Sequence, residues 1–424
     1  MSKLASLSLF NAQFTHDPYS FYERLHQDDL IYFDQENNSY FIGKFEDVER
    51  ILKSPQFTTK PLMQRAEPVM GDRVLAQMEG EEHSMKRRMV MRGLAKDYFV
   101  NQYEPMIKKI TRELLRPHLS TGVIDLVGDF GKDYAVLVTL GILGLPRENY
   151  REIAEWHKGV AEFITLFDQT ESEKLHSLDC SQKLIKLISP LVECRREHPE
   201  NDFLSLLSSP LQPELAMSTS EITALCLNIL LAATEPADKT LAMMFKHLLS
   251  QPDAWNAVFE ERQLIRDALE ETLRLTSPVQ LIPREVSERV TISGVDIPEG
   301  AIVYCMIGAA NRDPAVFAKP NDFDLYRRRQ GRYTNGSKSK HLAFGAGMHM
   351  CLGAAFSSMQ LEVSANIILD LLPQPRMANP SSYCETGLYT RGPSSLVLHF
   401  TPHKECLVQP DSSDICTSEV EYGK

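Results

Sequence analysis

Apolar residues recur at helical spacing through most of the chain from about residue 80 to residue 280, and this pattern predicts a largely α-helical body. Within it, Ser218 and Glu221 form a capping-box pattern ahead of the long apolar segment "LCLNILLAATEPADKTLAMMFKHLL". We therefore expect a set of packed helices that contains one unusually long helix.

The pattern changes toward both ends of the chain. Residues 18–27 have helical spacing, and "LIYFDQENNSYFIGKF" predicts a β-hairpin that turns at Asn37 and Asn38. Between residues 280 and 305, β-branched residues alternate with glycine and proline, which predicts short strands. One more helix is expected at 352–372, and a last short strand near "SSLVLHF". The fold class predicted from these patterns is mainly α with small β-sheets.

Composition indicates a single globular unit. No Gly/Ser-rich or Pro-rich linker interrupts the 424 residues, so we expect one domain over residues 1–400 and a polar, disordered tail over 401–424. The net charge of −12 argues against a nucleic-acid partner. No basic and apolar targeting region begins the chain, and no apolar segment reaches the roughly 20 residues that span a bilayer. We expect a cytoplasmic monomer without a membrane partner.

Eight cysteines are present, none in a Cys-x-x-Cys pair, which argues against a zinc ribbon or a thioredoxin-type redox centre. Cys351 is distinct because Gly345, Gly347 and Gly353 surround it and a segment of helical periodicity follows. Glycine permits positive φ and lets a flat ligand approach the backbone. Free N–H groups and the dipole at a helix N-terminus stabilise a thiolate. This setting suits a sulfur that stays an anion while it binds a metal.

The fixed residues around this cysteine resemble the haem-binding loop of the haem-thiolate monooxygenases, the cytochromes P450, and match it at every position: Phe344-x-x-Gly347-x-His349-x-Cys351-x-Gly353. The resemblance implies the cytochrome P450 fold, with haem b between a long kinked distal helix and the helix after the cysteine loop. It implies Cys351 as the axial iron ligand, a thiolate whose electron donation favours O–O cleavage. Phe344 would pack over the sulfur, His349 would face a haem propionate, and Gly345 and Gly353 would belong to the cofactor-binding loop.

Two further sets of residues match the family in the expected order. Glu271-x-x-Arg274 in "EETLRL" and Arg327 in "FDLYR" match its ion network, which implies that they hold the cysteine loop in place. Other Glu-x-x-Arg pairs, such as Glu113 and Arg116, are expected to be surface helix pairs. The cations that the resemblance assigns to the haem propionates are His83, Arg87 and Arg284.

One position of the long helix departs from the family pattern. The family has an acid followed by an alcohol that directs water and protons to bound oxygen, whereas this chain has Glu235 followed by Pro236. Proline lacks an N–H donor and kinks a helix, which fits a helix that opens a groove above the haem. Thr234 or Thr240 could replace the missing hydroxyl, or polar groups of the substrate could order the water. Our hypothesis at this point is proton delivery assisted by the substrate.

Five segments are similar to a cyclodipeptide-oxidising branch of the family that shares the proline: "QRAEPVM", "EWHKGVAEFIT", "LLAATEPADKT", "MIGAANRDP" and "ETGLYTRGP". This resemblance implies conversion of cyclo(Leu-Leu) to pulcherriminic acid by successive N-oxidation and desaturation with O2. Two alternatives remain open: oxidation of another small apolar metabolite (another cyclodipeptide, a terpene or a fatty acid), and a non-enzymatic haem-thiolate sensor or haem carrier. Family positions of the substrate pocket correspond to Val69, Met70, Phe163, Phe167, Ala232, Ala233, Ile282, Leu388 and Tyr389.

The sequence contains no recognisable flavin or nicotinamide module. The segment "GAGMHM" begins like a Gly-x-Gly-x-x-Gly fingerprint, but it ends in methionine and follows a loop. We therefore expect electrons from separate proteins, a ferredoxin and ferredoxin reductase. The basic run at 327–340 together with Lys86, Arg88 and Arg92 is a candidate docking face for an acidic partner, and an ordinary solvated surface is the alternative.

Overall fold

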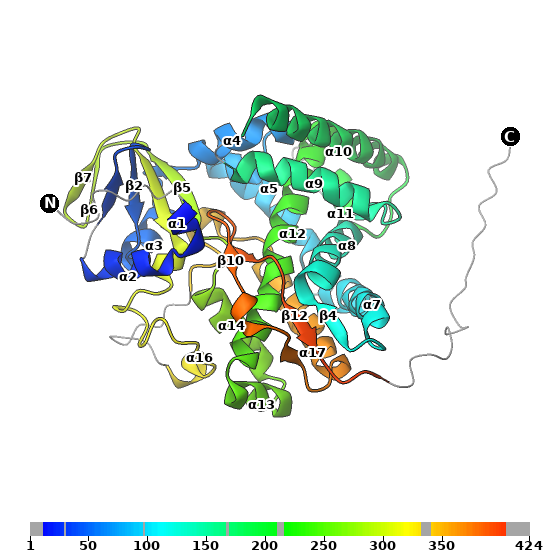
Figure 1. Cartoon of the computed structure of the whole chain (residues 1–424). Coiled ribbons are helices and arrows are strands. Elements are labelled where there is room, and N and C mark those ends of the chain that lie inside the picture. Colours follow the sequence, from blue (N-terminus) through cyan, green and yellow to red (C-terminus); the bar gives the residue numbers. More distant parts are fainter. Residues whose placement is uncertain are drawn as a thin grey trace.

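The computed structural model describes residues 12–28, 31–95, 98–166, 169–209, 216–331 and 341–403. Helix α12 (Thr219–Leu249) runs through the middle of the molecule and contacts α8, α10, α14 and α17 (Figure 1). Within the described residues, no helix is both long enough and apolar enough to cross a membrane. The other α-helices are α1 (Ala12–His16), α2 (Tyr19–Gln27), α3 (Phe45–Lys53), α4 (Lys60–Met70), α5 (Gly80–Gly93), α7 (Glu104–Leu115), α8 (Lys132–Leu143), α9 (Tyr150–Thr165), α10 (Glu171–Glu197), α11 (Phe203–Ser208), α13 (Pro252–Glu260), α14 (Leu264–Leu275), α15 (Ile307–Ala310), α16 (Arg327–Gln330) and α17 (Ala354–Leu371).

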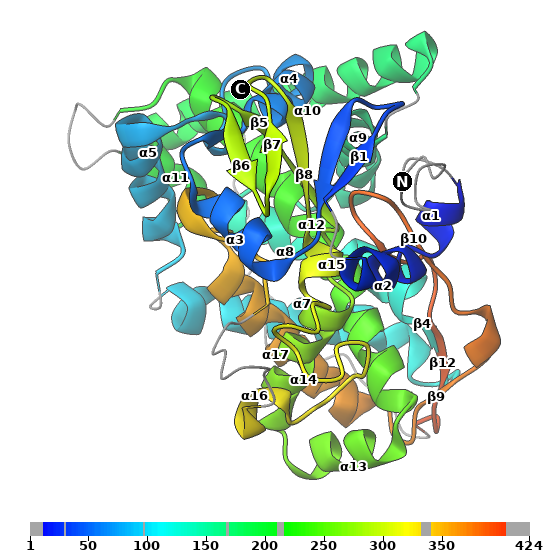
Figure 2. The same cartoon turned by 90° about the vertical axis from the view of Figure 1, so that its left-hand side faces the viewer.

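The strands form one larger sheet and three small ones. The larger sheet has the order β1-β2-β8-β5-β3, in which β2 and β8 are parallel and the other neighbours are antiparallel. It lies at one side of the molecule, with α2 and α3 beside it (Figures 1 and 2). The small sheets are β4-β12-β9, β6-β7 and β10-β11. The strands are β1 (Tyr32–Asp34), β2 (Ser39–Ile42), β3 (Phe57–Thr58), β4 (Val123–Asp125), β5 (Leu281–Val286), β6 (Val290–Ile292), β7 (Val295–Ile297), β8 (Ile302–Met306), β9 (Arg376–Met377), β10 (Glu385–Thr386), β11 (Gly392–Pro393) and β12 (Val397–His399).

The long helix begins where the capping-box pattern predicts it. The Ser218 hydroxyl accepts the N–H of Glu221 at 3.1 Å, and the Ser218 N–H donates to the Glu221 carboxylate at 2.8 Å. Two of the backbone donors at the helix start are thereby satisfied. The helix then continues through Pro236 to Leu249. The predicted hairpin, the strands around residues 280–305 and the helix after the cysteine loop are also confirmed.

One strand that the sequence patterns did not predict lies within the largely helical region between residues 80 and 280. Strand β4 lies inside that region and pairs with β12, with Ile124 opposite Leu398. Three residues are too few for an alternating pattern to appear, and the partner strand lies far along the chain. The end of the described chain stays attached to the fold here, because the His403 N–H donates to the Leu119 carbonyl at 2.9 Å. The remainder of the predicted 401–424 tail, from residue 404, lies outside the described residues.

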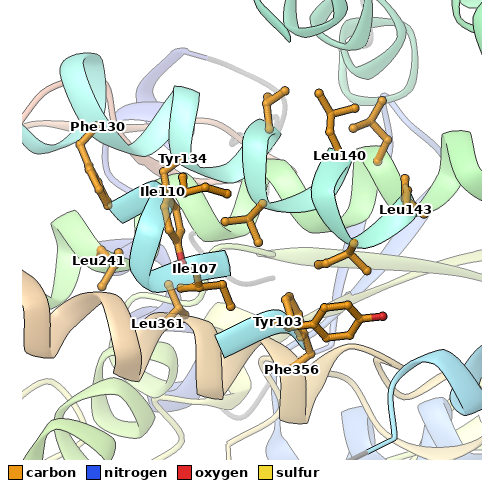
Figure 3. Close-up of a cluster of buried hydrophobic side chains, with 14 of the residues drawn as sticks. Tyr103, Ile107, Ile110, Phe130, Tyr134, Leu140, Leu143, Leu241, Phe356 and Leu361 are labelled. Atoms are coloured by element: carbon orange, nitrogen blue, oxygen red, sulfur yellow. The ribbon is translucent and has the colours of Figure 1, made fainter. Parts of the chain in front are cut away.

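Buried aromatic side chains join several helices of the main core. Figure 3 shows Phe130 and Tyr134 packed toward Leu361, with side chains of α7 between the ribbons. The rings of Phe130 and Tyr134 stack with their centroids 4.9 Å apart. The Tyr134 hydroxyl accepts from Ser364 at 2.9 Å and donates to the carbonyl of Gln360 at 3.2 Å, so its burial leaves no unpaired polar atom. These side chains fix α17 relative to α8 and α12.

Candidate active site

Two glycines in the left-handed region shape the loop that leads to Cys351. Gly345 has φ +69° and Gly347 has φ +74°, a conformation that residues with a side chain rarely adopt. A Cβ atom on Gly347 would lie 2.5 Å from the carbonyl oxygen of Leu52, so α3 and the loop approach too closely for another residue. The loop closes through a hydrogen bond of 2.8 Å from the Cys351 N–H to the Phe344 carbonyl.

Cys351 lies directly ahead of α17, whose N-cap residue is Gly353. Burial raises the pKa of the Cys351 thiol, whereas a hydrogen bond from the Gly353 backbone and the positive charge of Arg87 lower it. Burial is the largest of these effects. The predicted thiolate-stabilising groups are therefore present, and a metal cation bound to the sulfur would add the remaining stabilisation.

Four nitrogen-bearing side chains gather beside the cysteine loop. The rings of His83 and His349 lie with their centroids 4.6 Å apart. Arg87 donates to the carbonyl of Met350, within the loop, at 2.8 Å. Burial lowers the pKa of His349 to about 4, and the positive charges of Arg284, His83 and Arg87 act in the same direction. The positive charge beside the loop therefore comes from the guanidinium groups of Arg87 and Arg284.

This cluster fits the two carboxylates of a haem. His83 is 2% exposed, and its Nδ1 atom is buried without a hydrogen-bond partner among the described residues. Arg284 is 4% exposed, and its Nη1 donates to the carbonyl of the adjacent Pro283 at 2.9 Å. A buried cation is stable when an anion and hydrogen-bond acceptors surround it. Two propionate groups would supply both, directly beside the candidate sulfur ligand.

The predicted ion network is assembled around one buried carboxylate. Glu271 accepts from Nε and Nη2 of Arg274 at 2.9 and 2.8 Å, and from Nε of Arg327 at 3.0 Å. Arg274 also donates to the carbonyl of Asn311 at 2.8 Å. The side chain of Asn311 in turn accepts the N–H of Leu342, at the start of the cysteine loop, at 2.6 Å. The network thus connects α14 to the loop through a short chain of hydrogen bonds.

The two hydroxyls considered as replacements on the long helix are engaged elsewhere. Thr234 is 3% exposed, donates to the carbonyl of Leu230 at 2.8 Å and is hydrogen-bonded to His157 of α9 at 2.5 Å. Thr240 is 1% exposed and donates to the carbonyl of Pro236 at 2.6 Å. Both hydroxyls are buried and donate to the backbone of their own helix.

Glu235 has a partner that the sequence did not reveal. Its carboxylate accepts the hydroxyl of Thr390 at 2.7 Å, and Thr390 lies in the turn between β10 and β11. Burial lowers the pKa of His157 to about 4, although the negative charge of Glu235 opposes this change. One turn further along α12, burial raises the pKa of Asp238 to about 7. Thr390 and His157 fall within two of the quoted segments, but no local pattern predicts a contact between distant segments.

The residues predicted for the substrate pocket divide into four groups. Val69 and Met70 are fully buried in the main core and have no exposed surface for a ligand. Phe167 lies outside the described residues. Ala232 is exposed on α12, although that helix is surrounded by protein. The half-buried members are Phe163, Ala233, Ile282, Leu388 and Tyr389.

Several basic side chains of the candidate docking face form ion pairs within the protein itself. Lys86 forms ion pairs with Glu82 and Glu221, and both Arg328 and Arg329 pair with Asp267. Residues 332–340 lie outside the described residues. The two members without an ion pair among the described residues are Arg88, which is exposed, and Arg92, which is half-buried.

The sequence profile of cytochrome P450 matches residues 142–391. The chain belongs to the cytochrome P450 family. It is 46% identical over 395 residues to pulcherriminic acid synthase of Bacillus subtilis (strain 168), covering 93% of this chain and 97% of that protein. It is 27% identical to the biotin biosynthesis cytochrome P450 of the same organism, over 88% of this chain and 93% of that protein. Its fold matches the crystal structure of CalO2 with a TM-score of 0.85 at 24% identity, covering 94% of this chain and 99% of the other.

As a cytochrome P450, the protein is an oxidoreductase, a monooxygenase whose cofactor is haem b. The predicted fold class, mainly α with small β-sheets, is confirmed. Bacterial cytochromes P450 receive electrons from redox partners such as ferredoxins.

Proposed function

We propose that this cytochrome P450 oxidises a cyclodipeptide, and that it converts cyclo(Leu-Leu) to pulcherriminic acid. One observation carries the proposal: the 46% identity to pulcherriminic acid synthase extends over 93% of this chain and 97% of the relative. The identity to the biotin-biosynthesis member over a similar length is 27%. The reaction is a series of N-oxidation and desaturation steps, each with O2 as oxidant.

The predicted pocket residues that retain accessible surface support an apolar substrate. Ala232 and Ala233 contribute methyl groups, and Ile282 and Leu388 contribute aliphatic surface. Such surfaces bind leucyl side chains through the burial of apolar area. Tyr389 adds a hydroxyl that can bond to an amide group of the substrate ring.

The residues of the cysteine loop and its neighbours would hold the cofactor. Cys351 would bind the haem iron through its sulfur, with Phe344, Gly345 and Gly353 in the same loop. A haem held there would supply the activation of O2 and the transfer of one oxygen atom to the substrate. The propionate-binding side chains are His83, Arg87, Arg284 and His349. The ion network of Glu271, Arg274 and Arg327 keeps the loop in position.

The proposal extends to the organisation of the protein. Residues 1–400 form a single haem domain, and electrons come from a ferredoxin with its reductase. We place the enzyme in the cytoplasm, where reduced ferredoxin is supplied. It acts as a monomer.

The experiment is a titration of the ferric protein with cyclo(Leu-Leu), followed by Soret absorption, with cyclo(Gly-Gly) as the matched control. A saturable shift to high spin with cyclo(Leu-Leu), absent with cyclo(Gly-Gly), supports the proposal. Turnover with ferredoxin, reductase and O2 then has to give the di-N-oxidised, desaturated product by mass spectrometry. A haem band without a shift would leave the monooxygenase class in place and point to another apolar metabolite. Binding without electron-dependent turnover would favour a sensor.

A further inference from the structure

The long helix lacks a hydroxyl directly after its acid, because Pro236 follows Glu235. Thr234 and Thr240 are buried and already donate to backbone carbonyls of the same helix. A hydroxyl has one proton to donate, so neither can donate to the acid as well. An alcohol partner of Glu235 therefore has to come from another element.

Thr390 meets this requirement. Its hydroxyl donates to Oε2 of Glu235 at 2.7 Å, a length typical of a hydroxyl bound to a carboxylate. The two residues are 155 positions apart in the chain, and both are half-buried. A hydroxyl that donates one bond keeps its lone pairs, so Thr390 can still accept a hydrogen bond from water.

Hydrogen bonds on both sides fix the backbone around Thr390. The carbonyl of Tyr389 accepts the N–H of Gln280 at 2.9 Å, and the N–H of Arg391 donates to the carbonyl of Pro278 at 2.7 Å. Thr390 itself forms an antiparallel β-bridge with Val279, which lies between Pro278 and Gln280. The hydroxyl is therefore held by a rigid support before any substrate binds.

Arg391, the residue after Thr390, connects the turn to the N-terminal part of the chain. It is 3% exposed and donates to the carbonyls of Thr15 and His16, at the end of α1, at 2.6 and 2.9 Å. Its Nε atom lies 3.6 Å from the carboxylate of Glu385 in β10. Displacement of the turn would break these bonds together.

We propose that Thr390 supplies the alcohol that the long helix lacks, so that Glu235 and Thr390 form a proton relay assembled from two distant segments. When the carboxyl group of Glu235 has taken a proton from solvent, it becomes the donor of this hydrogen bond and passes the proton to the Thr390 oxygen. The Thr390 hydroxyl turns its own proton away from Glu235 and releases it toward the site. Each monooxygenation consumes one O2, two electrons from the redox partner and two protons, and it yields one oxidised substrate and one water. The relay supplies the two protons. It replaces the substrate-assisted delivery that the sequence suggested.

The test compares Thr390→Val, which removes the hydroxyl with little change in shape, with Thr390→Ser, which keeps it. Thr386→Val, at an exposed position of the same hairpin, is the matched control. The full-length holoenzyme is used with a ligand that gives a high-spin shift, so a wrong substrate assignment would appear before any variant is compared. The readouts are product and hydrogen peroxide per electron pair consumed, the solvent isotope effect, the ligand dissociation constant and the melting temperature.

We expect Thr390→Val to lower product per electron pair by at least about tenfold, because positioned proton donors contribute about 10²–10⁴-fold. Peroxide should rise correspondingly, the solvent isotope effect should change, and the ligand dissociation constant should stay within about twofold. Thr390→Ser and Thr386→Val should behave like the unaltered enzyme. Adding Pro236→Thr to Thr390→Val should restore coupling. Unchanged coupling in Thr390→Val would overturn the proposal, as would equal losses in the Val and Ser variants or a failed rescue with the fold intact.

Discussion

Arg327 lies 56 positions beyond Glu271 in the chain, yet its Nε atom reaches both oxygens of the Glu271 carboxylate, at 3.0 and 3.1 Å. Both side chains are almost completely buried. When one partner of a buried ion pair is removed, the charge of the other stays buried without compensation, and the folded state is destabilised. The hydrogen bonds of Glu271 therefore stabilise both the fold and the position of the cysteine loop.

Replacement of Glu271 by alanine is expected to lower the free energy of unfolding by about 3–5 kcal/mol, the usual effect of breaking a buried ion pair. Haem incorporation should fall with it, because Arg274 would no longer be fixed beside Asn311 and the cysteine loop. Chemical denaturation and the ratio of Soret to protein absorbance measure the two effects. Glu113→Ala is the control, since its side chain is exposed and should change stability by less than about 1 kcal/mol. Equal effects of the two substitutions would contradict the role of the network.

Replacement of Cys351 by serine is expected to abolish the thiolate signature of the reduced, CO-bound protein, because no other described cysteine lies in the glycine loop. Haem retained in the variant should absorb like a haem without a sulfur ligand. Cys384→Ser, at another exposed cysteine, should leave the spectrum unchanged. A thiolate spectrum in the Cys351 variant would disprove the ligand assignment.

Because His157 of α9 is buried, we expect the folded state to lose stability in acid. Burial lowers the pKa of His157 from an ordinary 6.5 to about 4, so between these values the unfolded chain binds a proton that the folded chain does not. The free energy of unfolding should therefore fall as the pH drops from about 6.5 to about 4, by about 3 kcal/mol for this group, and level off below that. Burial lowers the pKa values of His349 and His247 in the same direction.

Denaturant unfolding of the His157→Gln variant as a function of pH checks this expectation. The variant should show a shallower fall between pH 6.5 and pH 4 than the unaltered protein. His198→Gln, at an exposed histidine after α10, should follow the unaltered curve. Parallel curves for the unaltered protein and the His157 variant would refute the assignment.

Charge reversal at Arg88 and Arg92 is expected to slow reduction by ferredoxin and to weaken the dependence of its rate on salt, because both side chains lack an ion pair among the described residues. Stopped-flow reduction at several ionic strengths gives the rates. Arg151→Glu, at an 82% exposed side chain of α9, is the matched charge reversal at a different site. An unchanged salt dependence in the double variant would exclude this face as the docking site.

Much of the architecture could be predicted because it depends on local patterns. The capping box at Ser218, the glycines before Cys351 and the helix after it are encoded within a few residues of the positions that they shape. The short strand at Val123–Asp125 could not be predicted, since only its pairing with a strand near the C-terminus makes it a strand.

In the site, too, the sequence predicted what local motifs encode and missed a contact between distant segments. The order of family motifs identified Glu271, Arg274 and Arg327 and the cations beside the cysteine, and the fold brings them together. It did not identify Thr390, whose contact with Glu235 depends on tertiary structure alone. Val69 and Met70, which were predicted to line the pocket, lie completely buried in the main core.

The bond between Thr390 and Glu235 also has an evolutionary consequence. When an acid and its alcohol occupy adjacent positions of one helix, neither can drift without the other. Here the turn between β10 and β11 carries a hydroxyl that bonds to the acid, so under the proposed relay the helix position beside the acid does not need an alcohol and can be proline. In an alignment of relatives, a proline at this helix position should therefore co-vary with a hydroxyl-bearing residue on the distant turn.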